Sequence, residues 1–394
     1  MRHGTNYIHS AATSTVCLSK SAERNVIFMK NPLKIFLIRR YQSHWSQHSG
    51  INQFIKYMDK ELFQITEHVV LPNQNKTRPI RFLKRKISDF LRRGGPARYH
   101  VNDFLAELHG LCDFFRHRYD ILFYLDGEHS LNFLPGWISI FSNFVNRPRV
   151  IAMYHQPPDN KLHTWIDMDA LRKLDSAIVF SEIQADDLSR YLPKKNITTV
   201  LHGIDVDFFR PDISNKDNEK FRCLSVGYWL RDYDTVIKAA ESLKDYSTIE
   251  FHIVSSKVNP PSDLKNVYVH KDISDDVLLK LYQKSDILFM PLLDATANNV
   301  ILEALACGLP VITTELPGTK DYLTGREGFL VPPGELDSYI NKLLFLYKNR
   351  GKEDQMSLRA RKRAEELSWP NFSRKLEKLL LEITQREQCS NSKP

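Results

Sequence analysis

The sequence has few of the features that mark secreted, metal-binding or membrane-spanning proteins. Its five cysteines, at positions 17, 112, 223, 307 and 389, lie far apart and form no CxxC pair. Such spacing argues against a disulfide framework or a zinc site and favours a reducing compartment. No apolar run approaches the roughly 20 residues that a membrane-spanning helix needs. The 394 residues are 42% hydrophobic and 26% charged, which predicts a globular protein of two or three domains.

The first 30 residues have no clear periodicity and contain a single acidic residue, Glu23. They are rich in Ser, Thr and Ala, a composition that transit peptides share, and they lack the apolar stretch of a secretory signal. We interpret residues 1–30 as a disordered tail or as a mis-assigned start, with Met29 as the initiating residue, because a strand is predicted directly afterwards.

Positive charge is concentrated in one stretch. Residues 76–98 contain nine Lys or Arg and one Asp, so they carry the whole net charge of +8, and the rest of the chain balances at 46 against 46. A helix there would place Ile80, Leu83, Ile87 and Leu91 on one face. It can lie on anionic lipid, at the cytoplasmic face of a membrane, or pack on the first domain as an ordinary cytoplasmic helix. Few aromatic residues accompany the charge, which argues against nucleic-acid binding.

Strand and helix patterns alternate along both halves of the chain, which predicts βαβ units and parallel sheets. In the first half we expect helices in 51–63, 101–119 and 165–174. The expected strands there lie in 33–41, 118–130, 149–159, 175–181 and 197–205. In the second half the expected strands lie in 221–227, 249–256, 266–272, 286–293, 309–316 and 328–333. The helices expected there lie in 233–244, 275–285, 298–308, 335–349, 356–367 and 369–387.

These patterns predict an α/β protein of two doubly wound, Rossmann-like domains. A polar stretch without periodicity separates them. We place the first domain at 31–208, the linker at 209–220, the second domain at 221–368 and a terminal helix with its tail at 369–394. Because open α/β sheets bind ligands outside the carboxyl ends of their strands, two such domains facing each other predict a cleft between them.

The segment DATANNVILEALACGLPVITTELPG, residues 294–318, raises the question of what Glu303 does in an apolar helix. Asn298 and Asn299 stand where the helix begins, and a helix N-terminus suits a diphosphate. Glu303 lies four residues after Asn299 on the same face, where a carboxylate can accept two hydrogen bonds from a ribose diol. The alternative is a capped core helix whose glutamate is paired locally.

The segment resembles the nucleotide-sugar motif of family-4-type retaining glycosyltransferases, which have the GT-B fold. Their pattern is Glu, seven residues, Glu, then Ala-x-Ala-x-Gly-x-Pro-Val, and EALACGLPV at 303–311 is similar to its second half. The resemblance extends over about residues 33–385. It includes HQPP at 155–158, VLHGIDVDFFRP at 200–211, LSVG at 224–227 and LSWPNFSRKLEKL at 367–379. It implies that Glu303 binds ribose and that the last helix crosses back to the first domain.

Two positions depart from the family pattern. The first glutamate, which usually contacts the sugar, falls at Ala295, and Asp294 is one step away. The second domain of the family opens with Val-Gly-Arg and a Lys about six residues later, whereas Gly227 is followed here by Tyr228. We therefore predict that Arg231 is the diphosphate partner. The alternative is a surface arginine paired with Asp232 or Asp234.

Other polar residues follow the predicted strands of the first domain. His155 and Gln156 come after one strand, where they can contact the donor sugar or the acceptor. Glu128, in the sequence LDGEHS, can orient an acceptor hydroxyl or cap the next helix. In the first strand-to-helix loop, Gly50 allows close approach of the backbone to the donor. The further candidates in these loops are Asp126, His129, His44, Ser46 and His48, of which His44 and His48 are predicted acceptor contacts.

No residues are predicted to bind a metal. Asp167 and Asp169 are similar to the Asp-x-Asp motif of another glycosyltransferase fold, but they fall in a helical pattern. Residues two apart on a helix do not face each other, so they read as solvated charge.

The resemblance thus implies a metal-independent, retaining, hexosyl-type glycosyltransferase that uses a nucleotide-diphosphate sugar and needs no further cofactor. Its donor site would comprise Asp294, Thr296, Asn298, Asn299, Glu303 and Gly50, with His155 and Arg231 as catalytic residues. Its products would be glycans, polysaccharides or glycolipids. The alternatives are a nucleotide-sugar epimerase of the same fold and a non-catalytic binding or scaffold protein. Nothing in the sequence marks a protein nucleophile.

Overall fold

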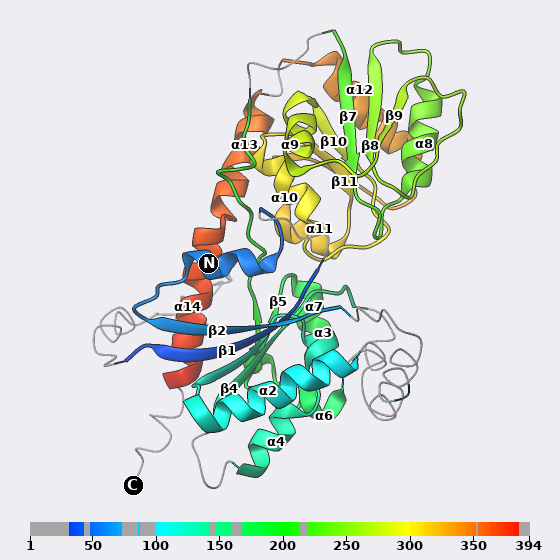
Figure 1. Ribbon diagram of the computed structural model, residues 1–394. Coiled ribbons are helices and arrows are strands. Elements are labelled where there is room, and N and C mark those ends of the chain that lie inside the picture. The colour runs from blue at the N-terminus through cyan, green and yellow to red at the C-terminus, as the bar shows by residue number, and fades with distance from the viewer. Residues whose placement is uncertain are drawn as a thin grey trace, which may run out of the picture.

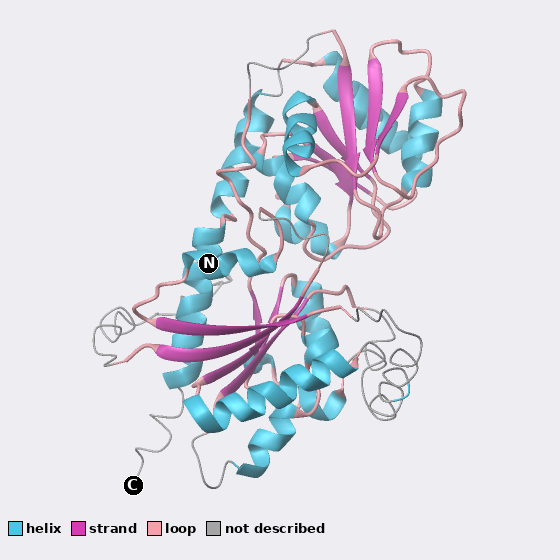
Figure 2. Cartoon of the chain, in the orientation of Figure 1, coloured by secondary structure: helices cyan, strands magenta, loops and turns pink. Residues whose placement is uncertain are grey.

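The computed structural model describes residues 31–42, 48–72, 86, 99–141, 147–158, 167–212, 219–351 and 354–385. It shows two α/β domains, each built on a sheet of six parallel strands (Figure 1). Helices flank both sheets (Figure 2). The α/β architecture of two doubly wound domains is therefore as predicted. None of the described helices is long and apolar enough to cross a bilayer.

The sheet of the first domain has the strand order β2-β1-β3-β4-β5-β6. Its strands are β1 (Leu33–Arg40), β2 (Phe63–Val70), β3 (Ile121–Tyr124), β4 (Arg149–Tyr154), β5 (Ser176–Val179) and β6 (Ile197–Thr199). The four residues of β3 and of β5 are all buried, as expected for strands covered on both faces. Its helical elements are η2 (Ile51–Tyr57), α2 (Val101–His117), α3 (Gly127–Ser130), α4 (Leu134–Phe141), α6 (Met168–Leu171), α7 (Glu182–Leu188) and η3 (Lys194–Asn196).

One strand of this sheet is missed by the sequence prediction. The expected helix at 51–63 is a short 3-10 helix, η2, and the chain then forms β2 at the sheet edge. Edge strands are exposed on one side, and β2 carries polar residues on both of its faces. Its sequence therefore lacks the continuous apolar run that marks the central strands.

Helix α2 carries a buried carboxylate, Glu107. Its two oxygens accept hydrogen bonds from the hydroxyls of Tyr99 at 2.6 Å and Tyr124 at 2.9 Å. They also accept the backbone N–H groups of Asn132 at 2.9 Å and Phe133 at 2.8 Å. Burial raises the pKa of Glu107 to about 7. This network fixes α2 to β3 and to the turn before α4, away from the second domain.

The second domain repeats the architecture, with the strand order β12-β11-β10-β7-β8-β9. Its strands are β7 (Phe221–Val226), β8 (Ile249–Val254), β9 (Val267–His270), β10 (Ile287–Met290), β11 (Val311–Thr314) and β12 (Gly328–Val331). Its helices are α8 (Tyr233–Ser242), α9 (Asp275–Lys284), α10 (Asn299–Ala306), α11 (Pro317–Tyr322) and α12 (Leu336–Lys348). All six strands fall inside the ranges expected from the sequence.

Two consecutive helices connect the domains at the end of the chain, α13 (Asp354–Glu366) and α14 (Trp369–Gln385). Helix α13 packs on α10 of the second domain, and α14 runs alongside the first domain (Figure 1). Apolar residues of α14, such as Phe372, Leu376 and Leu380, share a core cluster with Phe54 of η2. The terminal helix thus closes one side of the first domain's core.

The turn into α14 is packed tightly against the segment that leads out of the first domain. Trp369 is 1% exposed and donates its backbone N–H to the carbonyl of Ile204. A Cβ on Gly203 would lie 2.1 Å from the indole ring of Trp369. Only glycine therefore fits at position 203 without moving the indole.

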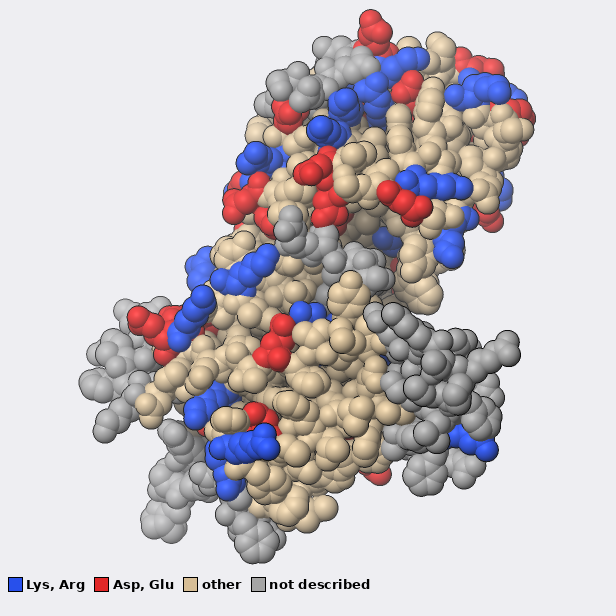
Figure 3. Space-filling view, viewed as in Figure 1, with Lys and Arg blue, Asp and Glu red and all other residues tan. Residues whose placement is uncertain are grey.

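Charged side chains of both signs are interspersed over both domains on the face in Figure 3. Of the basic stretch at 76–98, only Lys86 belongs to the described residues. The predicted membrane contact of this stretch falls almost wholly outside the described residues and stays a prediction.

We predict that Gly203→Ala destabilises the protein by about 1–3 kcal/mol, the typical effect of overpacking a well-filled site, because the new methyl group meets the Trp369 ring. Thermal or urea unfolding measures the effect. Gly136→Ala in α4 is the matched control, since its Cβ would meet only the end of the flexible Lys173 side chain at 3.1 Å. The control should be neutral or slightly stabilising. Equal effects of the two substitutions would contradict the packing at Gly203.

Candidate functional site

A cavity of about 660 Å³ lies between the two domains, at the carboxyl ends of both sheets. Its walls come from loops that follow β1, β3, β4 and β5 of the first domain and β7 and β10 of the second. Ten of the candidate residues line it: Gly50, Asp126, Glu128, His129, His155, Gln156, Arg231, Asn298, Asn299 and Glu303. Residues more than 250 positions apart in the chain thus meet in one space.

The N-terminus of α10 faces this cavity. Asn298 is its N-cap, and the Asn298 Oδ1 atom accepts the backbone N–H groups of Val300 at 3.1 Å and Ile301 at 3.4 Å. The asparagine side chain thus satisfies two of the backbone amides at the helix N-terminus that we expected to suit a diphosphate. The positive end of the helix dipole still points toward the cavity.

Arg231 supplies a cation beside this helix end. Its Nε and Nη1 atoms donate to the carbonyls of Val226 at 3.0 Å and Trp229 at 2.8 Å, and Nη2 lies 3.4 Å from Asn298 Oδ1. No described carboxylate forms an ion pair with it. The alternative pairing with Asp232 does not occur, because Asp232 caps α8 by accepting from Thr235. Burial lowers the pKa of the Arg231 guanidinium, but the group stays charged at neutral pH.

The loop that carries Arg231 has an unusual backbone. Gly227 has φ +91°, and a Cβ there would lie 3.2 Å from Arg231 Nη2. Leu230 has φ +56°, which is rare for a residue with a side chain. A hydrogen bond from Leu293 N to the Leu230 carbonyl, at 3.0 Å, holds this turn. Strained backbone is held only where its surroundings fix it, and here it aims the guanidinium at α10.

Glu303 lies one helical turn inside α10 and is 6% exposed. One of its oxygens accepts the hydroxyl hydrogen bond of Tyr282 at 2.7 Å. Burial raises the pKa of Glu303 to about 7, and the negative charge of Asp275 adds to the rise. The alternative of a locally paired glutamate is therefore realised for one oxygen, while the side chain still lines the cavity.

The opposite wall belongs to the first domain. Glu128 accepts the backbone N–H groups of His155 and, at 2.8 Å, of Gln156 through its Oε1 atom. The His155 ring stacks on Phe180, with ring centroids 4.8 Å apart, and its Nε2 atom bonds the Leu125 carbonyl. Because a carbonyl only accepts, Nε2 carries the proton and the lone pair of the neutral ring is on Nδ1.

Four other predicted residues are placed elsewhere. Thr296 does not line the cavity; its hydroxyl donates to the His155 carbonyl at 2.7 Å and so joins the two domains. The Asp294 carboxylate accepts from Ala295 N at 2.7 Å within its own loop and also lies off the cavity. The His48 ring stacks on Phe208 at 3.6 Å, outside the cavity lining. His44 lies outside the described residues.

Sequence reasoning did not identify several residues of the cavity. His202 lines it, and burial lowers the pKa of this histidine to about 3, so the ring is neutral. Asp275 reaches it from the start of α9, and Tyr228 and Trp229 form an exposed aromatic rim. Each of these residues stands close to the end of a strand or the start of a helix, and His202 also belongs to VLHGIDVDFFRP, one of the motifs that carry the resemblance.

Asp167 and Asp169 each have a local partner and do not form a metal site. Asp167 caps α6 by accepting from Ala170 N, and Asp169 pairs with Arg172 at 2.9 Å. Within the described residues no group of three or more His, Cys, Asp or Glu is arranged to hold a metal.

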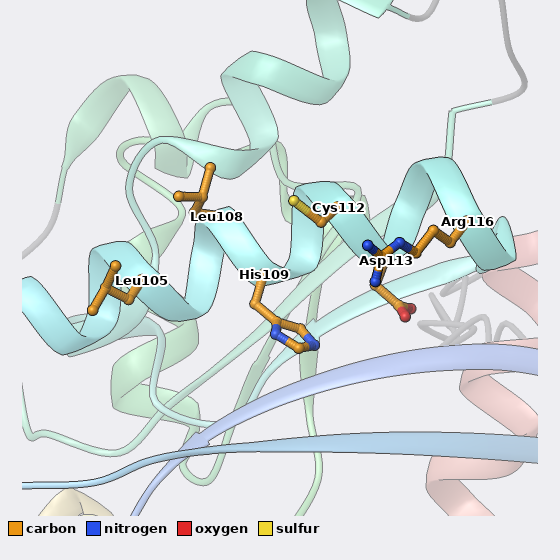
Figure 4. A pocket seen from close by; sticks show the side chains of 6 residues that line it. All are labelled: Leu105, Leu108, His109, Cys112, Asp113 and Arg116. Carbon is orange, nitrogen blue, oxygen red and sulfur yellow. The ribbon is translucent and has the colours of Figure 1, made fainter.

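A smaller hollow of about 340 Å³ lies along α2. Its lining residues are Leu105, Leu108, His109, Cys112, Asp113 and Arg116. In Figure 4, His109 and Asp113 point toward the strands, while Leu108 and Cys112 point to the other side of the helix. All six come from one helix, so no second element brings a reacting group to face them.

Comparison with known protein families finds a match in the second domain. Residues 220–349 match the family model described as "Glycosyl transferases group 1". The second domain is therefore similar to the group 1 glycosyltransferases over these residues. The resemblance drawn from EALACGLPV is thereby confirmed, since that motif lies within the matched residues.

Solved structures show a likeness that extends to the whole fold. The structure of sucrose-phosphate synthase from Thermosynechococcus elongatus aligns over its whole length with 90% of this chain, at a TM-score of 0.66 and 15% identity. The structure of Anabaena HepE in complex with UDP-glucose aligns over its whole length with 89% of this chain, at a TM-score of 0.62 and 12% identity. At these identities the likeness establishes the fold, and the GT-B architecture predicted from the sequence is confirmed.

Curated relatives match over a shorter part. Sulfoquinovosyl transferase SQD2 of Arabidopsis thaliana is 31% identical over 101 residues, which are 25% of this chain and 20% of that protein. The capsular polysaccharide biosynthesis glycosyltransferase CapM of Staphylococcus aureus is 30% identical over 101 residues, 25% of this chain and 26% of that protein. The chain therefore matches about a fifth to a quarter of the length of these relatives.

We predict that Glu303 makes stability pH-dependent. Its native pKa of about 7 exceeds the ordinary value of 4.5, so the folded state binds more protons than the unfolded state between these two pH values. The free energy of unfolding should therefore fall as pH rises from about 4.5 to about 7 and then level off. Glu303→Gln removes this dependence, so the variant should gain stability relative to the wild type, by on the order of 3 kcal/mol in total.

Urea unfolding of both proteins at pH 5, 6, 7 and 8 measures this difference. The contribution of Glu107 is common to both and cancels. A difference in unfolding free energy that does not change with pH would contradict the raised pKa of Glu303.

Proposed function

We propose that this protein transfers a sugar from a nucleoside-diphosphate sugar to an acceptor hydroxyl. The observation that carries the proposal is Arg231, a half-buried cation in the interdomain cavity that has no carboxylate partner among the described residues. Beside it, the N-terminus of α10 adds a second positive end. Together they form a site for a group with two or more negative charges, such as a diphosphate.

The remainder of the donor fits the second domain. Glu303 lies four residues after Asn299 on α10 and can accept hydrogen bonds from the two hydroxyls of a ribose. Near it, Leu278 of α9 and Val226 at the end of β7 provide apolar surface for a base. HepE has been solved with UDP-glucose, which makes uridine donors the first to test.

Catalysis in this proposal consists of stabilising the departing diphosphate and orienting the acceptor. Arg231 and the α10 dipole lie where negative charge develops as the sugar leaves, so their effect increases in the transition state. His155 lies across the cavity, joined to Thr296 by the hydrogen bond between the domains. We further propose that a hexosyl group is transferred with retention and without a metal, as in the similar family, and that the acceptor enters along the first domain.

The product class proposed is a polysaccharide, glycan or glycolipid. CapM is named for capsular polysaccharide biosynthesis and SQD2 for sulfoquinovosyl transfer, and each is similar to this chain over 101 residues. The family model matches residues 220–349 and so does not include the first domain, where the acceptor is proposed to bind.

The test is nucleotide binding by calorimetry and thermal shift with UDP, GDP and ADP, their monophosphates and their sugar conjugates. We expect one base to bind, and a ligand at 100 times its Kd should add about 2.7 kcal/mol to stability. The diphosphate should bind at least about tenfold more tightly than the monophosphate, because Arg231 gains a charge-assisted contact. Arg231→Gln should abolish that difference, whereas Glu303→Gln should weaken diphosphate and monophosphate alike.

The matched control is Arg361→Gln in α13. Arg361, like Arg231, donates to backbone carbonyls, in this case those of Val206, Phe209 and Ala306. Unlike Arg231, it forms an ion pair, with Glu365 at 2.9 Å, and it does not line the cavity. This variant should lose stability and keep nucleotide affinity. Failure of well-folded wild-type protein to bind any nucleotide would overturn the donor site.

Turnover separates transfer from the alternatives. Incubation with donor alone distinguishes an epimerase, which changes the sugar nucleotide without an acceptor, from a transferase, and tight binding without turnover on any acceptor indicates a scaffold. For a transferase, the anomeric configuration of the product, read by NMR, tests retention.

A further inference from the structure

We infer that Glu128 determines donor specificity by binding a hydroxyl of the sugar that the donor carries. This inference rests on the proposed function, since it concerns the group attached to the far end of the diphosphate. Three observations support it: the burial and partners of the Glu128 carboxylate, its place along the proposed donor, and the kind of hydrogen-bonding groups on that wall of the cavity.

One oxygen of the Glu128 carboxylate accepts hydrogen bonds from the protein, and the other accepts none from the described residues. It is 2% exposed, and its Oε1 atom accepts two backbone N–H groups, those of His155 and Gln156. Its Oε2 atom is buried and has no hydrogen-bond partner among the described residues. Buried carboxylate oxygens are seldom left unpaired, so this atom calls for a donor that the described chain does not supply. Because Glu128 lines the cavity, a ligand there can provide it.

The position of Glu128 matches the sugar end of the donor. Along α10, Glu303 lies roughly 6 Å further into the helix than Asn299, so the ribose extends away from the helix N-terminus. The group on the other side of the diphosphate must then extend toward the first domain. There Thr296 donates to the His155 carbonyl at 2.7 Å, and His155 in turn donates its N–H to Glu128. Two hydrogen bonds thus separate Glu128 from the loop that begins α10.

This wall presents hydrogen-bond acceptors. Besides Glu128 Oε2, the Nδ1 atom of His155 offers a lone pair in the neutral ring, because Nε2 donates to the Leu125 carbonyl. Two acceptors in this position call for a ligand with hydroxyl groups to donate. A sugar ring has such hydroxyls, whereas a nucleotide phosphate has only acceptor oxygens and would be repelled by a carboxylate.

The test compares the nucleoside diphosphate with its sugar conjugate, using the base and sugar found in the nucleotide screen. Glu128→Gln keeps an oxygen for the two backbone N–H groups and replaces the second oxygen by an amide NH₂. We expect the Kd of the nucleoside diphosphate to change less than about twofold. We expect the sugar conjugate to bind about 10- to 100-fold more weakly, as for loss of one hydrogen bond to a charged group.

A series of deoxy-sugar donors then identifies the hydroxyl. One deoxy analogue should bind the wild type about tenfold more weakly than the parent donor and should bind Glu128→Gln as well as the parent does. This coupling between one hydroxyl and one carboxylate is a result that a purely structural role of Glu128 would not produce.

Glu107→Gln is the matched control, because Glu107 is also a buried carboxylate of the first domain that accepts backbone N–H groups, but it does not line the cavity. It should lose stability and leave the ratio of the two Kd values unchanged. Equal weakening of diphosphate and sugar conjugate by Glu128→Gln, or no change in either, would overturn the inference and assign Glu128 to holding the end of β4. Failure of the wild type to bind nucleotides would instead overturn the proposed function, and the inference with it.

Discussion

The return of the chain from the second domain to the first is the constraint on which the cavity depends. Two parallel sheets create a shared site only when the carboxyl ends of their strands face each other. Here α13 packs on α10, and α14 completes the core around Phe54. The fit of Trp369 against Gly203 fixes the turn between these contacts. The relative position of the two walls therefore follows from hydrophobic packing remote from any ligand.

Within that frame, charges of both signs line the cavity. Glu303 lies on α10, Arg231 lies beside the helix N-cap Asn298, and Glu128 belongs to the wall of the first domain, an arrangement in which we place the donor from Glu303 past Arg231 to Glu128. A carboxylate, a cation and a second carboxylate in this order are complementary to a ribose, a diphosphate and a sugar. Each carboxylate is tied to the protein through one oxygen, by Tyr282 or by the backbone after β4, which orients the other oxygen in advance of binding.

The sequence predicted most of this arrangement because local patterns determine most of it. Buried strands such as β3 and β10 are short apolar runs, and Asn299, which follows the Asn298 cap, shares one helix face with Glu303. The edge strand β2 was missed because it has no such run. Contacts between the domains, such as that of Thr296 with His155, carry no local signal and could not be predicted.

We propose that Arg231 and α10 hold a diphosphate between Glu303 and Glu128, and a crystal structure of the protein with its nucleotide sugar is the decisive test. We expect both phosphates within hydrogen-bond distance of Arg231 or the first turn of α10, the ribose hydroxyls on Glu303 and a sugar hydroxyl on Glu128. Phosphates bound away from Arg231, or a nucleotide lying in the opposite direction with its base toward the first domain, would contradict it.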